Sequence, residues 1–202
     1  MRWYWIDRFI EFESGRYAKA IKNISLAEDH IHDHFPFYPM IPASLVIEGM
    51  AQTGGLLVCE HSEFREKVVL AKVPKATFYC DAVPGDTLVY TTKVEYIKEE
   101  GAMVTATSYK GDVLHAEAEI VFAHLNDSRL GSLFDPDTFL RMMRLLGAFD
   151  IGHAADGSPL QPPARLVRSA EVADHPTPTR QASAASGDGQ ASAASGDQGT
   201  ER

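Results

Sequence analysis

Two side chains in this sequence have the types and the spacing to move protons. His34 directly precedes a loop with prolines at positions 36, 39 and 42, and Glu48 follows fourteen residues later in an apolar stretch. Each proline lacks an N–H and restricts the residue before it, so the loop cannot be regular helix and would hold the histidine in place. Burial of the carboxyl group would favour its neutral form, which can donate a proton. Together, His34 and Glu48 could serve as a general base and a general acid.

Both residues also have ordinary structural interpretations. A histidine beside a proline is usually structural or exposed, and a glutamate in an apolar helix usually pairs with a lysine or arginine. A third possibility is a metal site, because three alternating histidines would share one face of a strand; they are His30, His32 and His34. Residues 27–29 instead indicate the start of a helix or turn, which would spread the imidazoles apart. We therefore expect neither a metal nor a cofactor.

The sequence around Glu48 predicts a long buried helix over residues 44–61. Ser44 follows the proline loop and is the expected N-cap, since its hydroxyl can accept a hydrogen bond from an N–H of the first turn. Apolar residues cover nearly every face, which is typical of a helix that is buried all round. Gly49, Gly54 and Gly55 lower helix propensity, so we expect another part of the backbone to approach closely there.

Strands are expected on both sides of this helix. Residues 4–13 and 16–25 form a predicted hairpin around the turn at Ser14-Gly15. After the helix, turns at residues 84–86, 100–101 and 111–112 separate further strands, which is typical of an antiparallel meander. These strands cover residues 68–73, 77–83, 87–97, 102–109 and 113–124. A curved antiparallel sheet wrapped around one hydrophobic central helix satisfies both elements, so we predict an α+β fold.

The C-terminal part of the chain changes character near residue 150. A helix is expected after Asp135-Pro136, with an apolar face that includes Phe139 and Met142. Beyond residue 150 the chain is rich in Ala, Ser, Gly and Pro, and residues 181–188 are repeated at 190–197. Such a segment has too few apolar side chains to offset its ordering entropy. We predict one domain over residues 1–150, including the C-terminal helix, and a disordered low-complexity tail over residues 151–202.

Composition and charge exclude several classes of protein. The chain has a formal net charge of −9, so general nucleic-acid binding is not expected, because phosphate neutralisation needs an excess of lysine and arginine. The N-terminus lacks the pattern of a secretory signal, and the longest apolar stretch contains Glu48 and Pro42, which argues against a membrane span. Two cysteines, Cys59 and Cys80, cannot form a disulfide scaffold. We therefore expect a cytoplasmic protein.

The segment from His34 to Gln52, HFPFYPMIPASLVIEGMAQ, resembles the signature of the hotdog-fold 3-hydroxyacyl-[acyl-carrier-protein] dehydratases. Residues 78–88 and 115–119 resemble later blocks of the same family, and the similarity covers about residues 4–125. Glutamate at position 48 is similar to the non-isomerising branch of the family. The chain departs from the family pattern at Phe37 and Ala43, where the family has glycine, at Ser44, where it has an apolar residue, and at Gly49, where it usually has alanine.

This resemblance implies a fold, an activity and a set of partners. The fold would be the hotdog, and two protomers would form a homodimer, often assembled further into a hexamer. His34 would remove a proton from C2 of a 3-hydroxyacyl thioester, and Glu48 of the partner chain would protonate or orient the 3-hydroxyl group that leaves. The product would be a trans-2-enoyl thioester in fatty-acid or related lipid synthesis, with acyl carrier protein as the partner. Substrate-binding residues would be Phe37, Pro42, Ala43, Ser44 and Gln52.

Two alternatives to this activity remain open at this point. A hotdog thioesterase would hydrolyse the same class of thioester, although thioesterases of this fold usually lack the histidine element with a glutamate fourteen residues later. A non-catalytic module would bind the acyl thioester and leave it unchanged, which the altered glycine positions favour. Phe37 could narrow the entrance to the acyl site, and Ser44 could add a hydroxyl group near the thioester carbonyl.

Overall fold

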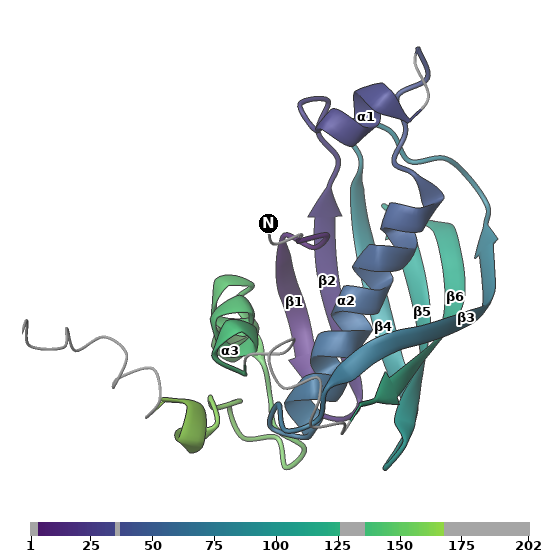
Figure 1. Cartoon of the computed structure of the whole chain (residues 1–202). Helices are drawn as coiled ribbons and strands as arrows, with labels where there is room; N and C mark the ends of the chain where they lie inside the picture. Colours follow the sequence, from purple (N-terminus) through teal and green to yellow (C-terminus); the bar gives the residue numbers. More distant parts are fainter. Residues whose placement is uncertain (1–3, 35–36, 126–135, 168–202) are drawn as a thin grey trace, which may run out of the picture.

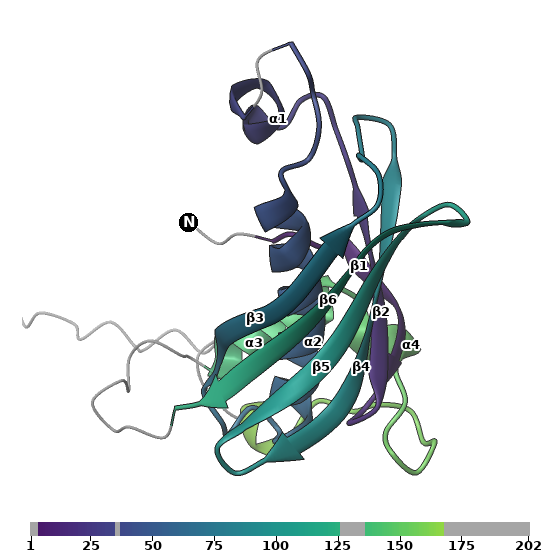
Figure 2. The same ribbon diagram turned by 90° about the vertical axis from the view of Figure 1, so that its right-hand side faces the viewer.

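The computed structural model describes residues 4–34, 37–125 and 136–167 of the chain. In these residues a six-stranded antiparallel sheet curves around one long helix, α2 (Figures 1 and 2). The predicted α+β hotdog fold is confirmed. The helices are α1 (Asp29–Asp33), α2 (Ala43–His61), α3 (Pro136–Leu145) and α4 (Ala148–Ile151). The strands are β1 (Arg8–Glu13), β2 (Tyr17–Asn23), β3 (Val68–Phe78), β4 (Thr87–Lys98), β5 (Gly101–Lys110) and β6 (Val113–His124).

The strand order in the sheet is β1-β2-β4-β5-β6-β3, so β1 and β3 form its two edges. The first two strands form the predicted hairpin, with Glu13 opposite Tyr17 and Gly15 at a positive φ of 69° in the turn. Two strands were expected between residues 68 and 83, but the structure has the single strand β3. Its pairing with β6 is irregular between Leu70 and Lys75, and these irregularities explain the interrupted sequence pattern.

Helix α2 is buried as predicted, but its start and its glycines differ from expectation. Pro42 is the N-cap and Ser44 lies inside the first turn, so the predicted serine cap is wrong. Proline supplies a suitable φ for a helix start without a side-chain hydrogen bond. The expected close approach of another backbone occurs at Gly49, where a Cβ would lie 3.0 Å from the carbonyl oxygen of Trp5, but the other close contacts at these glycines come from side chains. A Cβ at Gly49 would lie 2.5 Å from Cε2 of Tyr90, and one at Gly54 would lie 3.0 Å from Cγ2 of Val104.

The chain after residue 136 covers part of the β1 side of the sheet. The N–H of Phe9 donates to the carbonyl of Leu146 (2.8 Å), and the N–H of His153 donates to the carbonyl of Phe12 (2.8 Å). Leu160 and Leu166 are buried, so packed residues continue past the predicted domain boundary at residue 150. Residues 168–202, which include most of the predicted tail, lie outside the described residues, as does Asp135.

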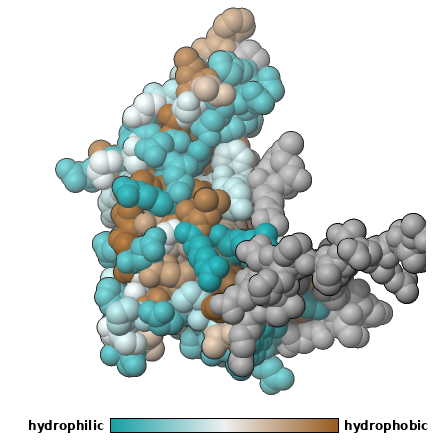
Figure 3. Space-filling model, turned by 90° about the vertical axis from the view of Figure 1, so that its left-hand side faces the viewer, coloured by the Kyte–Doolittle hydropathy of each residue, from teal (hydrophilic) through white to brown (hydrophobic). Residues whose placement is uncertain are grey.

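Figure 3 shows the side of the molecule on which β1 and α3 lie, with hydrophobic surface interspersed among polar residues. Helix α1 lies beyond the end of the strands (Figures 1 and 2). Within the described ranges, no helix is both long enough and apolar enough to cross a bilayer.

Candidate active site

The two predicted catalytic residues come from different elements at one end of the molecule. His34 is the C-cap of α1, where its N–H donates to the carbonyl of His30 (3.2 Å), and its side chain is exposed. Glu48 lies in the second turn of α2 and is half-buried. Helix α1 stands beyond the N-terminal end of α2 (Figures 1 and 2), and Glu48 belongs to the second turn from that end.

The histidines at positions 30 to 34 do not share a strand face. Residues 29–33 form helix α1, as residues 27–29 predicted, and a helix spreads alternating side chains around its axis. The described parts of the chain contain no group of three His, Cys, Asp or Glu side chains placed to hold a metal ion. The metal interpretation therefore has no geometric support in these residues.

Glu48 is held by two consecutive hydrogen bonds that begin at Trp5, three residues before strand β1. The N–H of Trp5 donates to Oε1 of Gln52 (2.9 Å), and Nε2 of Gln52 donates to Oε1 of Glu48 (2.8 Å). A backbone N–H can only donate, so it fixes which end of the Gln52 amide faces which partner. The amide nitrogen must then face Glu48. Sequence reasoning assigned Gln52 to substrate binding; the structure gives it a contact that orients the carboxyl group.

A cavity of about 220 Å³ begins beside Glu48 and Gln52. Its floor is a single face of α2, formed by Glu48, Ala51, Gln52, Gly55, Leu56 and Cys59. Val68 and Leu70 of β3, Phe122 of β6, and Phe139 and Met142 of α3 complete its lining. The cavity is therefore polar at the Glu48 end and apolar elsewhere, which suits a ligand with a polar head and a hydrocarbon chain.

The remaining predicted substrate-binding residues lie between α1 and the first turn of α2. Phe37 is fully exposed and has a positive φ of 71°, a conformation that costs a residue with a side chain about 1–2 kcal/mol. This is the position at which the resembling family has glycine. Ala43 and Ser44 are exposed at the start of α2, whereas Pro42 is buried. Phe35 and Pro36, between His34 and Phe37, lie outside the described residues.

Helix α1 is fastened to the sheet by a cluster of charged and aromatic groups that sequence reasoning missed. Nζ of Lys22 donates to Oε1 of Glu28 (2.6 Å) and lies 5.9 Å from the Trp5 ring centroid. The Trp5 ring meets His30 edge to face at 4.9 Å. Lys22 is only 6% exposed, which is rare for lysine unless its charge is paired. The pairing could not be predicted from the sequence, because it depends on the tertiary contact between β2 and the start of α1.

Burial and pairing shift the titration of this cluster. Burial alone would raise the pKa of Glu28, but the hydrogen bonds from Lys22 and from the N–H of Ser25 outweigh it and leave the pKa lowered. Burial lowers the pKa of His30, which favours its neutral form. The cluster therefore consists of one ion pair and a neutral imidazole that packs on Trp5. It fixes the helix that ends at His34.

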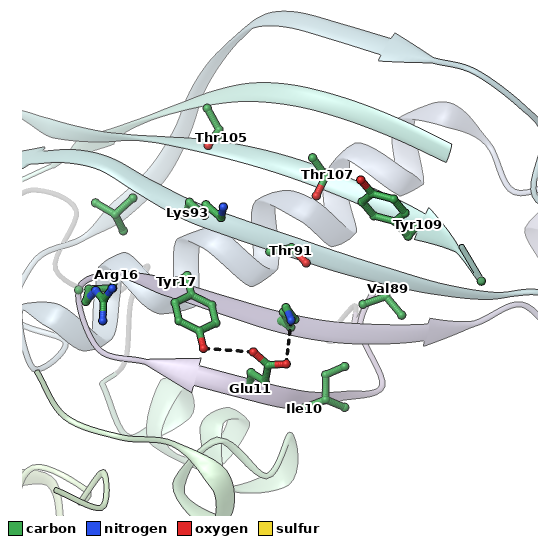
Figure 4. A pocket seen from close by; sticks show the side chains of 14 residues that line it. Ile10, Glu11, Arg16, Tyr17, Val89, Thr91, Lys93, Thr105, Thr107 and Tyr109 are labelled. Carbon is green, nitrogen blue, oxygen red and sulfur yellow. Dashed lines mark hydrogen bonds and ion pairs between the residues drawn. The ribbon is translucent and has the colours of Figure 1, made fainter. Parts of the chain in front are cut away.

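A second hollow of about 1060 Å³ lies on the outer face of the sheet (Figure 4). Its side chains alternate along β2 and β4 with the buried residues that face α2, so this hollow is on the opposite side from Glu48. Oε1 of Glu11 accepts a hydrogen bond from Lys19 (2.8 Å), and Oε2 accepts one from Tyr17 (3.1 Å). The bond from Lys19 lowers the pKa of Glu11. These groups satisfy one another, and neither predicted catalytic residue lines the hollow.

Comparison with known proteins identifies the family. Residues 3–123 match the family model of the FabA-like domain. The 3-hydroxyacyl-[acyl-carrier-protein] dehydratase FabZ of Pelotomaculum thermopropionicum is 37% identical over 119 residues, which cover 58% of this chain and 85% of that protein. The FabZ dehydratase of Sulfurovum sp. is 40% identical over 124 residues, which cover 57% and 82%. The chain therefore belongs to the FabA-like family, and its resemblance to the FabZ dehydratases is confirmed.

Solved structures support the same fold. A hot-dog-like protein from Thermanaerovibrio acidaminovorans is 15% identical with a TM-score of 0.51, and the match covers 60% of this chain and 90% of that one. The Streptococcus mutans protein smu.793, solved with acetyl CoA bound, is also 15% identical with a TM-score of 0.51, covering 62% and 93%. At this level of identity the comparison establishes the hotdog fold alone.

Proposed function

We propose that this protein dehydrates 3-hydroxyacyl thioesters carried on acyl carrier protein to trans-2-enoyl thioesters, in fatty-acid or related lipid synthesis. The observation that carries this proposal is the position of Glu48: its carboxyl group is oriented by Gln52 and borders an otherwise apolar cavity. The names of the curated relatives point to the same reaction. No cofactor is required, because the elimination moves only protons and an oxygen leaving group.

The proposed reaction uses two groups in opposite roles. His34 accepts the proton from C2 as the C2–H bond breaks and the C2=C3 double bond forms. Glu48 donates a proton to the 3-hydroxyl group as the C3–O bond breaks, so that the oxygen leaves as water. The first N–H groups of a helix have no partners within the helix, and the positive end of the helix dipole lies there. The exposed first turn of α2, at Ala43 and Ser44, would polarise the thioester carbonyl.

A homodimer would bring the two groups together. His34 is exposed at the end of α1, and Glu48 lies half-buried in α2, so a site shared between protomers would take the histidine from one chain and the acid from the other. Strand β3 pairs with β6 on one side only and exposes Leu70 and Phe78. We expect β3 of one protomer to pair with β3 of a second protomer. The same proposal includes further assembly of such dimers into a hexamer.

Acyl carrier protein is the proposed macromolecular partner, since carrier proteins are acidic and would need a basic patch. Lys72, Lys75, Arg141 and Arg144 are exposed candidates, while Arg129 lies outside the described residues. Reversal of the relevant charges should raise the KM for carrier-bound substrate and leave the KM for small thioester analogues nearly unchanged. Cys59 and Cys80 are free thiols, which suits the reducing cytoplasm in which this pathway would operate.

The test is product analysis by mass spectrometry on 3-hydroxyacyl thioesters of several chain lengths, for wild type, His34→Ala and Glu48→Gln. His32→Ala serves as a matched control, because His32 is an exposed histidine on the same helix. We expect loss of one water in wild type and in the control, and loss of activity in both other variants. Release of free thiol would instead indicate a thioesterase, and binding without conversion would indicate an acyl-binding module.

A further inference from the structure

The cavity beside Glu48 is lined along one face of α2, and we call it the channel. Its floor residues recur at intervals of three and four along α2, from Glu48 through Gly55 to Cys59, so they form one stripe. At 1.5 Å per residue, the stripe from Glu48 to Cys59 is about 16 Å long. A substrate whose reacting carbon lies at Glu48 would direct its hydrocarbon chain along this stripe, because the apolar lining residues of the cavity lie along it.

One wall of this channel comes from outside the matched family domain. The FabA-like match ends at residue 123, whereas Phe139 and Met142 of α3 line the cavity. Both side chains are half-buried, as expected for residues that border a cavity.

Helix α3 is held firmly enough to act as a wall. Leu140 and Met143 on its inner face are buried at 1% and 0% exposure. Phe139 stacks on Phe64 with ring centroids 6.2 Å apart, and the carbonyl of Leu146 accepts a hydrogen bond from β1. These contacts fix the helix at both ends. The position of Phe139 and Met142 is therefore set by the fold and not by the ligand.

From this geometry we propose that Phe139 and Met142 determine the length of acyl chain that the protein accepts. This inference rests on the proposed function, and it assigns the specificity of that site to a helix that lies outside the part of the chain matched by the family model. The two side chains border a cavity of about 220 Å³, so they limit the space beside the acyl chain, and we expect shorter chains to fit better than long ones.

The test measures binding and turnover separately. Unreactive saturated thioesters, namely butanoyl-, octanoyl- and hexadecanoyl-pantetheine, are titrated calorimetrically into the full-length wild type, Phe139→Ala and Met142→Ala. Each variant opens the wall, and each additional buried methylene strengthens binding about fourfold. We expect hexadecanoyl-pantetheine to bind about tenfold or more tightly to the variants than to wild type, with butanoyl-pantetheine changed by less than about twofold. Met142→Trp should act in reverse and weaken octanoyl-pantetheine.

Leu145→Ala is the matched control, because Leu145 lies on the same helix and is 68% exposed, away from the cavity. It should leave every affinity unchanged, and a thermal melt verifies that each variant is folded. Equal effects on all chain lengths, or a hexadecanoyl affinity that none of the wall variants changes, would overturn the proposal. If binding shifts with chain length as expected but no 3-hydroxyacyl thioester is dehydrated, the wall is upheld and the proposed function fails. If the protein dehydrates 3-hydroxyacyl thioesters but the wall variants do not change its chain-length preference, the proposed function is upheld and the role of the wall is wrong.

Discussion

Gln52 connects the backbone of the N-terminal segment to the carboxyl group that we propose as the acid. Its amide accepts from Trp5 and donates to Glu48, so loss of this one side chain would affect both packing and chemistry. A glutamine at this position is therefore a positioning residue. It acts on the reaction through Glu48 and need not touch the substrate.

Replacement of Gln52 separates its two contacts. Gln52→Leu should lower kcat by about tenfold to a hundredfold and cost about 1–3 kcal/mol of stability, because the Trp5 N–H loses its acceptor. Gln52→Glu keeps an acceptor for Trp5 but removes the donor to Glu48, so it should lose activity with less effect on stability. Steady-state kinetics and urea denaturation measure the two effects. If both variants kept wild-type kcat, the orienting role would be wrong.

Phe37 holds a backbone conformation that favours glycine. Phe37→Gly should relieve about 1–2 kcal/mol of strain, offset by about 0.5–1 kcal/mol for the greater freedom of glycine in the unfolded chain. The expected net gain in the free energy of unfolding is therefore about 0.5–1 kcal/mol, since the exposed ring contributes no burial. Phe37→Ala keeps the strain and should show no such gain. Chemical denaturation gives the free energy of unfolding of both variants. A gain in Phe37→Gly alone would show that backbone strain, and not the presence of the phenyl ring, lowers the stability of wild type.

At the scale of elements, the packing of the central helix on the sheet limits which side chains fit at the contact between them. Gly49 stands where the resembling family usually has alanine, and the Tyr90 ring of β4 occupies the space that a methyl group would fill. Tyr90 is fully buried. Glycine at position 49 is thus explained by the Tyr90 ring that packs against it.

Helix propensity and packing predict opposite results at Gly49. Alanine should gain about 1 kcal/mol in the helix, but its Cβ would lie 2.5 Å from Cε2 of Tyr90, and overpacking costs about 1–3 kcal/mol. We expect Gly49→Ala to destabilise wild type and to cost less in a Tyr90→Leu background, where only the backbone oxygen of Trp5, 3.0 Å from the Cβ, remains close. Gly55→Ala is the control, because its nearest contact would be an ordinary 3.4 Å. A double-mutant cycle by urea denaturation with no coupling would refute this packing account.

Helix α1 depends on the ion pair between Lys22 and Glu28, and this dependence has a defined pH range. The pKa of Glu28 in the folded state is lowered from 4.5, so its carboxylate stabilises the fold above that value and loses its effect as the pH falls through the lowered pKa. Glu28→Gln should cost about 2 kcal/mol at neutral pH, and the cost should shrink well below pH 4.5.

Glu11→Gln is the matched control for this pH dependence, because Glu11 also pairs with a lysine but on an exposed face. Its loss should cost about 0.5 kcal/mol or less at neutral pH. Urea denaturation at neutral and acidic pH gives both values. A cost of Glu28→Gln that did not change with pH would contradict the assignment of its effect to the charged carboxylate.

The sequence predicted those elements whose signal is local. The hairpin, the apolar central helix and the meander follow from turns and periodicity, and His34 and Glu48 follow from their unusual neighbours. Ser44 was assigned the N-cap because serine caps helices often, but Pro42 already provides a suitable φ. The roles of Gln52, Lys22 and Tyr90 could not be predicted, because each depends on a partner at least six residues away in another element or turn of the fold.

At the scale of the whole molecule, our proposal is that each chain supplies half of a catalytic site shared between two chains. His34 projects at the end of α1, Glu48 lies at the head of the α2 channel, and the edge strand β3 is open to a second copy. The C-terminal helix adds a wall to the channel that the matched family domain does not contain. A symmetric dimer would hold two such sites.

The measurement that tests the central claim most directly is complementation between two inactive variants. His34→Ala and Glu48→Gln are co-expressed with different tags, purified together and assayed for the enoyl thioester by mass spectrometry. If the histidine and the acid come from different chains, random mixing should restore about one quarter of wild-type activity, because about half of the dimers are mixed and each has one intact site. Each variant alone should remain inactive. Full activity in either variant alone would contradict dehydration by this pair of residues, and no recovery in verified mixed dimers would contradict a site shared between chains.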